Sequence, residues 1–203
     1  MKSMYLTPRL YNKLYSHMTY DNVLAIRVSL ETGMRIDDVL SLKRKNIKGR
    51  KLYYTAQKTG KEDRKVISQG LLVMLNKNLV TDDEDEYIFK HRLDDGKHRT
   101  RQAVWKNVKK ACAEIGLERN ITPHSARKSY AVELFHDKGL NITQKELQHE
   151  NATTTMLYAF SDILVDKNSN KINDIDFDLL CETIAERTAE ILIQKIPTLK
   201  NAL

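Results

Sequence analysis

Helix start and stop signals recur along this chain and constrain its fold more than any other feature of the sequence. Threonine–proline pairs at residues 7–8 and 122–123 each place a capping hydroxyl before a proline, a residue well tolerated in the first turn of a helix. Gly33 and Gly139 each end an apolar stretch of helical period, where glycine typically stops a helix. We therefore expect a chain built largely of short, well-delimited helices.

Further segments have apolar residues at helical spacing and are expected to form helices. In RQAVWKNVKKACAEIG, the lysines should face outward and the inward face should consist of Ala103, Val104, Val108, Ala111 and Cys112. The others are DNVLAIRVSLETG, in which Asp21 is the expected N-cap, RIDDVLSL, QGLLVMLNKNLV, TQKELQ, TTTMLYAF and FDLLCETIAERTAEILIQKI.

One segment breaks the helical pattern. The stretch NIKGRKLYYTAQKTGKEDRKVIS has β-favouring residues around Gly49 and Gly60, which predicts a small antiparallel sheet with hairpins. The expected fold class is therefore mainly α with a small antiparallel β-sheet (α+β). The polar stretch SDILVDKNSNKINDID is the one weak boundary, so we expect a compact domain over residues 1–160 and a C-terminal linker and helix over residues 161–203.

The charge balance is basic, with 34 Lys and Arg against 27 Asp and Glu and a net charge of +7. This favours a polyanionic partner, although a charge run is more often a solvated surface. Two segments, LSLKRKNIKGRK and KHRTRQAVWKNVKK, are basic, whereas TDDEDE and NDIDFD are acidic. The sequence has no long apolar run and no apolar signal core, and its two cysteines lack metal-binding spacing, so we expect reduced thiols in the cytoplasm and no membrane.

A set of polar residues stands at expected element ends, where side chains from distant segments can converge. An arginine with an aspartate three residues later begins one helix, a lysine lies at the tip of the predicted hairpin, and PHSAR places a histidine and an arginine on one helical face. In LQHENATTTMLYA, a tyrosine follows a histidine by nine positions. Each residue alone is more often an ordinary surface or packing residue. The full set of candidate site residues is Arg35, Asp38, Lys58, His124, Arg127, His149 and Tyr158.

Taken together, these segments resemble the catalytic domain of the tyrosine recombinases, the phage integrase family. TGMRIDDVLSL is similar to the first-arginine motif, PHSARKSYA to the His-x-x-Arg motif, and LQHENATTTMLYAF to the motif that runs from Leu-Gly-His to Tyr. The resemblance extends from about Leu6 to Phe160 and preserves the order and spacing of the motifs. One departure is Gln148, which stands where glycine is usual before the histidine, so the local backbone is expected to differ there.

The resemblance implies phosphoryl transfer without a metal or cofactor: a tyrosine attacks a DNA phosphodiester, forms a 3′-phosphotyrosine and releases a 5′-hydroxyl. Tyr158 is the expected nucleophile, with Tyr130 as the nearest alternative, and Lys58 is the expected general acid. Arginine offers phosphate oxygens a planar and permanently charged fork, which suits Arg35 and Arg127 to neutralising the charge of the transition state.

The remaining roles follow from the same resemblance. His124 is the expected proton acceptor and His149 the expected hydrogen-bond donor to the phosphate, whereas Asp38 is expected to orient Arg35 or His124. The implied partners are double-stranded DNA, further copies of the chain in a tetramer on DNA, and accessory DNA-bending proteins. The C-terminal helix is expected to pack on its own domain or to dock on a neighbouring protomer.

Alternative functions remain open at this level. A topoisomerase of type IB uses the same chemistry to nick and close DNA, and a DNA-binding regulator could keep the fold without catalysis. The presence of all six expected catalytic residues argues against a regulator, and a structural protein would not need both arginines. We expect a site-specific DNA recombinase or integrase, encoded by a bacterium, phage or mobile element, that acts in the cytoplasm in association with the nucleoid.

Overall fold

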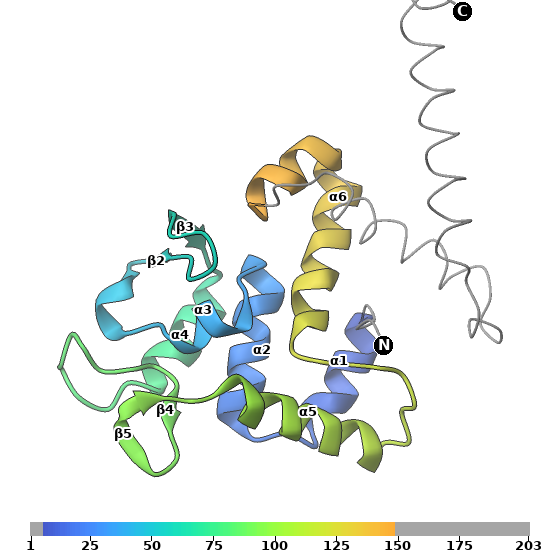
Figure 1. Cartoon of the computed structure of the whole chain (residues 1–203), viewed down its shortest axis with the longest axis horizontal. Helices are drawn as coiled ribbons and strands as arrows, with labels where there is room; N and C mark the ends of the chain where they lie inside the picture. The colour runs from blue at the N-terminus through green and yellow to red at the C-terminus, as the bar shows by residue number, and fades with distance from the viewer. Residues whose placement is uncertain (1–5, 149–203) are drawn as a thin grey trace, which may run out of the picture. The chain divides into compact units, whose positions relative to one another are not determined.

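Helices and two small antiparallel sheets form residues 6–148, the part of the chain that the computed structural model describes (Figure 1). This arrangement confirms the predicted α+β class. The helices are α1 (Pro8–Tyr15), α2 (Tyr20–Thr32), α3 (Ile36–Leu40), α4 (Gln69–Lys77), α5 (Arg101–Glu114) and α6 (His124–Glu146), with a 3-10 turn η1 (Arg44–Asn46). The strands are β1 (Ile47–Lys48), β2 (Lys51–Thr55), β3 (Glu62–Val66), β4 (Lys90–His91) and β5 (Asp94–His98).

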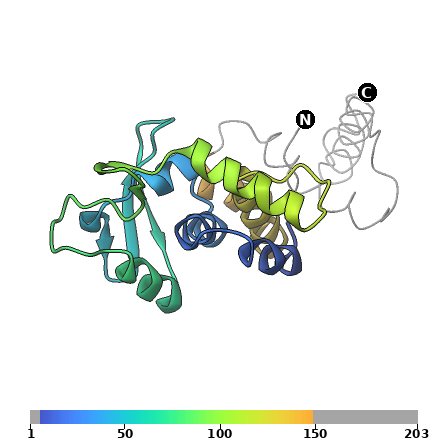
Figure 2. The same cartoon turned by 90° about the horizontal axis from the view of Figure 1, so that it is seen from below.

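Helix α2 lies at the centre of the described fold and contacts α3, α4 and α6 (Figures 1 and 2). It is apolar on several sides, as a helix covered by neighbours must be. Leu24, Ala25 and Val28 are fully buried on it. Helix α5 crosses beside α1 and α3, so the N-terminal ends of α3 and α5 come close to each other.

The sequence located the helices better than it located their caps. Helix α1 begins at Pro8 after Thr7, and α2 ends at Gly33 with the left-handed backbone (φ 70°) that glycine adopts readily. The prediction that Asp21 caps α2 is wrong. The N-cap is Thr19, two residues earlier, which has the extended cap conformation, and Asp21 instead accepts a hydrogen bond of 2.6 Å from Arg99.

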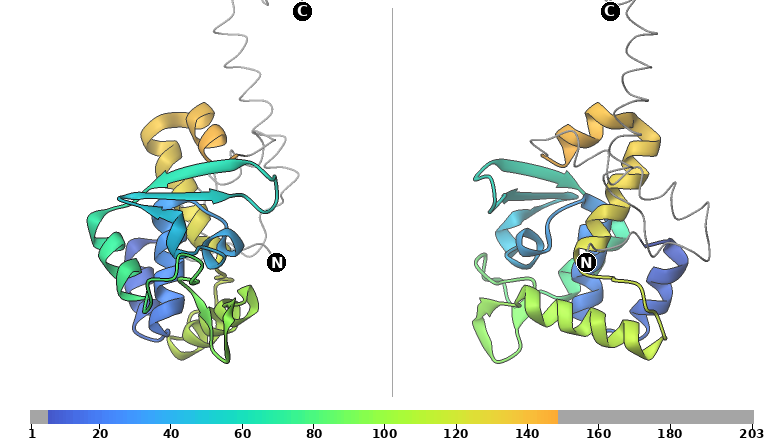
Figure 3. Two further views of the ribbon diagram at one scale, coloured as in Figure 1. Left: turned by 90° about the vertical axis from the view of Figure 1, so that its left-hand side faces the viewer. Right: turned by 45° about the vertical axis from the view of Figure 1, so that its right-hand side comes forward.

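Helix α6 corrects the predicted cap at Thr122 and confirms both the break at Gly139 and a helical segment after it. Pro123 occupies the N-cap position, so Thr122 lies outside the helix, where its N–H donates to Ser125 Oγ at 3.1 Å. Gly139 does break the helix, with φ 76° and ψ −179°, but helical structure resumes after this kink and continues to Glu146. The bend carries the last turns of α6 toward the β2–β3 hairpin (Figures 1 and 3).

The predicted sheet consists of β1, β2 and β3 in that order, all antiparallel. In the β2–β3 pair, Leu52 lies opposite Lys65, and both side chains are buried. The hairpin tip at residues 56–61 turns at Gly60, which has a positive φ of 67°. The second sheet, β4–β5, was not predicted, because its strands are short and lack the alternating β-branched residues that mark a strand.

One predicted basic segment is largely offset by a predicted acidic one. Lys43 and Lys45 both contact Asp85, at 3.0 and 2.7 Å, and Arg44 lies 3.8 Å from the buried carboxylate of Glu86. These contacts connect η1 to the loop before β4. The positive charge of residues 43–45 therefore has a structural partner within the chain.

Several expectations concern residues outside 6–148, including the boundary at residue 160, the segment TTTMLYAF and the helix near residues 177–196. Cys112 is buried and unpaired within the described part of the chain. Across residues 6–148, no helix combines the length and apolar character that crossing a membrane requires.

Replacing Gly33 with alanine tests the junction between α2 and α6. A Cβ atom there would lie 2.4 Å from the Tyr130 ring, and the backbone is left-handed. We expect Gly33→Ala to lower the free energy of unfolding by about 2–4 kcal/mol, since a left-handed penalty adds to overpacking. Urea unfolding measures this. Gly49→Ala is the control, because Gly49 has a similar φ but open space around it, and a loss of about 1 kcal/mol is expected. Equal losses in both variants would contradict the role of Tyr130.

Candidate active site

A pocket of about 530 Å³ lies where the N-terminal ends of α3, α5 and α6 meet. Arg35, the N-cap residue of α3, and His124, the first residue of α6, both line it. The helices thus bring together two of the predicted catalytic residues from positions 89 apart in the sequence. Arg101 and Trp105 of α5 line the same pocket and were not singled out from the sequence, although the basic run that contains them was a signal.

The electrostatics of His124 are those of a site with excess positive charge. The residue has an exposed edge, yet burial of its ring lowers its pKa, and the nearby charges of Arg127, Lys128 and Arg35 lower it further, to about 4. The imidazole is therefore neutral at physiological pH and has a lone pair available to accept a proton. A bound phosphate would oppose the cationic charge and raise this pKa.

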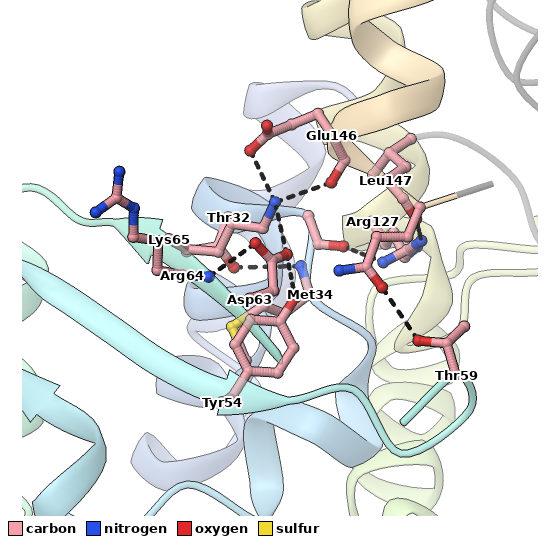
Figure 4. Close-up of polar contacts among 12 residues, drawn as sticks. Thr32, Met34, Tyr54, Thr59, Asp63, Arg64, Lys65, Arg127, Glu146 and Leu147 are labelled. Atoms are coloured by element: carbon pink, nitrogen blue, oxygen red, sulfur yellow. Dashed lines mark hydrogen bonds and ion pairs between the residues drawn. The ribbon is translucent and has the colours of Figure 1, made fainter. Parts of the chain in front are cut away.

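Arg127 is 4% exposed, and its charge acts on His124. Its guanidinium donates to the carbonyl oxygens of Gly33 and Leu147, each at 2.6 Å (Figure 4). Gly33 is two residues before Arg35. The bond from Arg127 to the Gly33 carbonyl oxygen therefore ties Arg127 to the segment that carries Arg35, the other predicted phosphate-binding arginine. The phosphate contact of Arg127 remains a prediction.

Asp38 is buried and senses the charges of both arginines. Burial raises the pKa of its carboxyl group, whereas a hydrogen bond from the Gln57 N–H and the charges of Arg35 and Arg127 oppose that rise. The Gln57 N–H donates to Asp38 Oδ1 at 2.9 Å. Asp38 therefore fastens the β2–β3 hairpin to α3, a role that the sequence did not indicate, and its orienting of Arg35 or His124 remains a prediction.

Lys58 lies in the hairpin tip, as predicted, and its side chain is exposed. Its two neighbours are both held by other segments. Gln57 is bonded to Asp38, and the Thr59 hydroxyl donates to Gln148 Oε1 at 3.2 Å. The backbone at Lys58 is thus fixed between α3 and the end of α6, while the long side chain is left to reach outward.

An ion network around the buried Lys65 joins the same hairpin to α6. Lys65 Nζ lies 2.7 Å from a Glu146 carboxylate oxygen and 3.3 Å from Asp63, and it donates to the Glu146 carbonyl oxygen at 2.8 Å (Figure 4). Tyr54 donates to Asp63 at 3.0 Å. Lys65 was not singled out from the sequence, because it is one of four consecutive charged residues in β3, EDRKV. The two-residue alternation of β3 was the signal that could have placed it inward.

Tyr130 is a poor candidate for the nucleophile. Burial, the charges of Glu146 and Asp63 and a hydrogen bond to Glu146 raise the pKa of its hydroxyl to about 12. Its ring also packs against Gly33. The predicted His149 and Tyr158 lie outside the described residues. Within residues 6–148, histidine, cysteine, aspartate and glutamate form no group of three or more that could hold a metal ion.

The sequence of this chain is similar to proteins of one known family. The model of the phage integrase family matches residues 4–163. The tyrosine recombinase XerD of Oceanobacillus iheyensis is 25% identical over 154 residues, which cover 72% of this chain and 52% of that protein. XerD of Lacticaseibacillus casei is 40% identical over 60 residues, which cover 29% of this chain and 20% of that protein. The chain therefore spans about half, or less, of the length of these relatives.

Solved structures share the fold at lower sequence identity. A lambda integrase dimer bound to a COC′ core site matches with a TM-score of 0.65 and 20% identity, over 87% of this chain and 51% of that one. XerH bound to a palindromic difH substrate, in a post-cleavage complex, matches with a TM-score of 0.60 and 20% identity, over 76% and 48%. The catalytic domain of bacteriophage HP1 integrase gives 0.59 and 22%, over 79% and 89%.

The lowered pKa of His124 predicts a specific pH dependence of stability. Between the ordinary value of 6.5 and about 4, the unfolded chain binds a proton at this site and the folded chain does not, so the wild type loses stability as the pH falls through this window. His124→Gln removes that loss, and its stability relative to the wild type should rise from pH 6.5 to pH 4. Urea unfolding at several pH values tests this. A constant difference between the two proteins would contradict it.

Proposed function

Because this chain belongs to the phage integrase family, we propose that it is a site-specific DNA recombinase that cleaves and rejoins DNA through a 3′-phosphotyrosine intermediate. The observation that carries the proposal is the shared pocket of Arg35 and His124, with Arg127 close enough to lower the pKa of that histidine. Cations gathered around a neutral proton acceptor suit a reaction in which a phosphodiester gains negative charge.

In the proposed cleavage step, the Tyr158 oxygen bonds to phosphorus and the bond from phosphorus to the 5′-oxygen breaks. The tyrosine proton passes to His124, and the leaving 5′-oxygen takes a proton from Lys58. Arg35, Arg127 and His149 stabilise the non-bridging oxygens.

Rejoining reverses these transfers: a 5′-hydroxyl attacks the phosphotyrosine, and Tyr158 recovers its proton. Since the phosphotyrosine conserves the energy of the broken bond, the reaction needs no nucleotide cofactor, and the arginines take the charge-neutralising part that a metal has elsewhere.

The proposed partners are double-stranded DNA and further copies of the chain, with a tetramer on DNA and accessory DNA-bending proteins. The net charge of +7 supports an anionic partner. The lambda integrase match is a dimer bound to a core site, which supports assembly on DNA. Residues 177–203 are proposed to dock on a neighbouring protomer, and the site of action is proposed to be the cytoplasm, in association with the nucleoid.

Tyr158→Phe is expected to abolish covalent attachment to DNA while leaving folding and DNA binding nearly unchanged, because only the nucleophilic hydroxyl is lost. A DNA site is first selected from a randomised pool by covalent capture with the wild-type chain. That site is then made as a nicked suicide duplex, and covalent attachment is measured on a denaturing gel after reaction in excess EDTA. Tyr130→Phe is the matched control and should still attach. An adduct that persists in Tyr158→Phe would assign the nucleophile to another residue.

Lys58→Ala is expected to slow cleavage of ordinary DNA by roughly 10²–10⁴-fold, the range for loss of a general acid. On a 5′-phosphorothiolate substrate, the loss should be no more than a few-fold, since sulfur departs without protonation. Single-turnover rates on both substrates give the comparison, with Lys61→Ala as the control from the same turn. Equal losses on both substrates in Lys58→Ala would remove the general-acid role.

A further inference from the structure

We propose that Gln148 and Thr59 form a latch that positions Lys58, by fastening the tip of the β2–β3 hairpin to the end of α6. Gln148 would then be a positioning residue for the proton transfer to the leaving oxygen. The inference rests on the proposed function, because it explains how the chain holds the lysine assigned as general acid. Gln148 is also the position before His149 at which this sequence has glutamine where glycine is usual in the family.

The backbone of Gln148 is the first observation. Its φ of 51° lies in the left-handed region, and within residues 6–148 the other positive φ angles belong to glycines. The chain turns here as it leaves α6, with the Gln148 N–H bonded to the Lys145 carbonyl oxygen at 3.1 Å. Glutamine here adopts a conformation that glycine favours, at a cost in strain that glycine avoids.

The side chain of Gln148 makes a contact with the hairpin that glycine could not make. Its Oε1 accepts a hydrogen bond from Thr59 Oγ1 at 3.2 Å, across a sequence separation of 89 residues. Glycine has no side chain with which to make this contact. Thr59 immediately follows Lys58, so the bond fixes the hairpin on the side of the general acid that faces α6.

The other side of Lys58 is held by α3. The Gln57 N–H donates to Asp38 Oδ1 at 2.9 Å, and the Gln57 side-chain amide donates to the Asp37 carbonyl oxygen at 3.1 Å. Lys58 is therefore the central residue of three, with a restraint before it and a restraint after it. A lysine side chain has four rotatable bonds, so its ammonium group can be aimed only if its backbone is fixed first.

The end of α6 is itself well anchored, which lets it serve as the fixed side of the latch. Lys65 binds Glu146 at 2.7 Å, and Arg127 donates to the Leu147 carbonyl oxygen at 2.6 Å (Figure 4). The residue after Gln148 in the sequence is His149, the predicted phosphate ligand. Through the latch, this anchored end of α6 restrains the tip of the hairpin that carries Lys58.

The contact itself is tested by amide hydrogen exchange of the full chain without DNA. Thr59→Val and Gln148→Ala should each raise the exchange rates of the Thr59 and Gly60 amides about fivefold, since the tip loses its outer restraint. Thr55→Val makes the same change at an exposed threonine of the same hairpin and should leave them unchanged. Unaltered tip exchange in both latch variants would overturn the proposal.

Cleavage of the suicide duplex tests the link to Lys58. Each latch variant should cleave the ordinary substrate about tenfold more slowly, and the phosphorothiolate substrate no more than about twofold more slowly, because only the first needs an aimed acid. The double variant should be no slower than the single ones, as expected for two halves of one contact. Equal losses on both substrates, or additive losses in the double variant, would overturn the role.

Gln148→Gly separates positioning from stability. Glycine relieves the left-handed strain, so this variant should melt at least as high as the wild type yet cleave the ordinary substrate as slowly as Gln148→Ala. A contact with a purely structural role would leave cleavage unchanged in the more stable protein, and that result would overturn the proposal. If the wild type forms no adduct on either substrate, the proposed recombinase function fails, whereas the hydrogen-exchange result decides the latch independently.

Discussion

A buried guanidinium, that of Arg127, is the constraint on which the rest of the site depends. Removing a charge from water is costly unless it is fully hydrogen-bonded, and here the carbonyl oxygens of Gly33 and Leu147 each accept a bond of 2.6 Å. Those oxygens belong to the end of α2 and the end of α6, whereas Arg127 belongs to the first turns of α6. One side chain therefore fixes three segments, and Tyr130 packs so closely on Gly33 that only glycine fits.

The positively charged residues of the described chain fall into two groups, those paired with acidic residues and those that act on His124. Where they serve the fold, acidic partners neutralise them, as Asp85 does for Lys43 and Lys45 and as Glu146 does for Lys65. Beside the pocket, burial lowers the pKa of His124 to about 4, and the charges of Arg127, Lys128 and Arg35 add to that effect. The neutral imidazole beside these cations is consistent with the proposed role of His124 as proton acceptor.

Local signals in the sequence predicted most elements and erred at their edges. Periodicity and glycine stops located α1, α2, α3 and α5, and the β-favouring stretch located the three-stranded sheet. The predicted caps were both displaced: Thr19 caps α2 two residues before Asp21, which instead accepts a bond from Arg99, and Pro123 caps α6 one residue after Thr122. Gly139 interrupts α6 as predicted, and the turns beyond it, which include most of the predicted segment TQKELQ, are anchored by Lys65 and Arg127.

By itself, the sequence determined the residue types of the proposed chemistry, because arginines, histidines, a lysine and a tyrosine at element ends favour metal-free phosphoryl transfer. It also determined their order, through which the family resemblance was found. Only the tertiary structure decided which contacts position these residues. Asp38 accepts a hydrogen bond from the hairpin at Gln57, Lys65 binds Glu146, and Gln148 accepts a hydrogen bond from Thr59. These partners lie 19, 81 and 89 residues apart, so no local pattern encodes their pairing, which arises only when the packed helices bring the segments together.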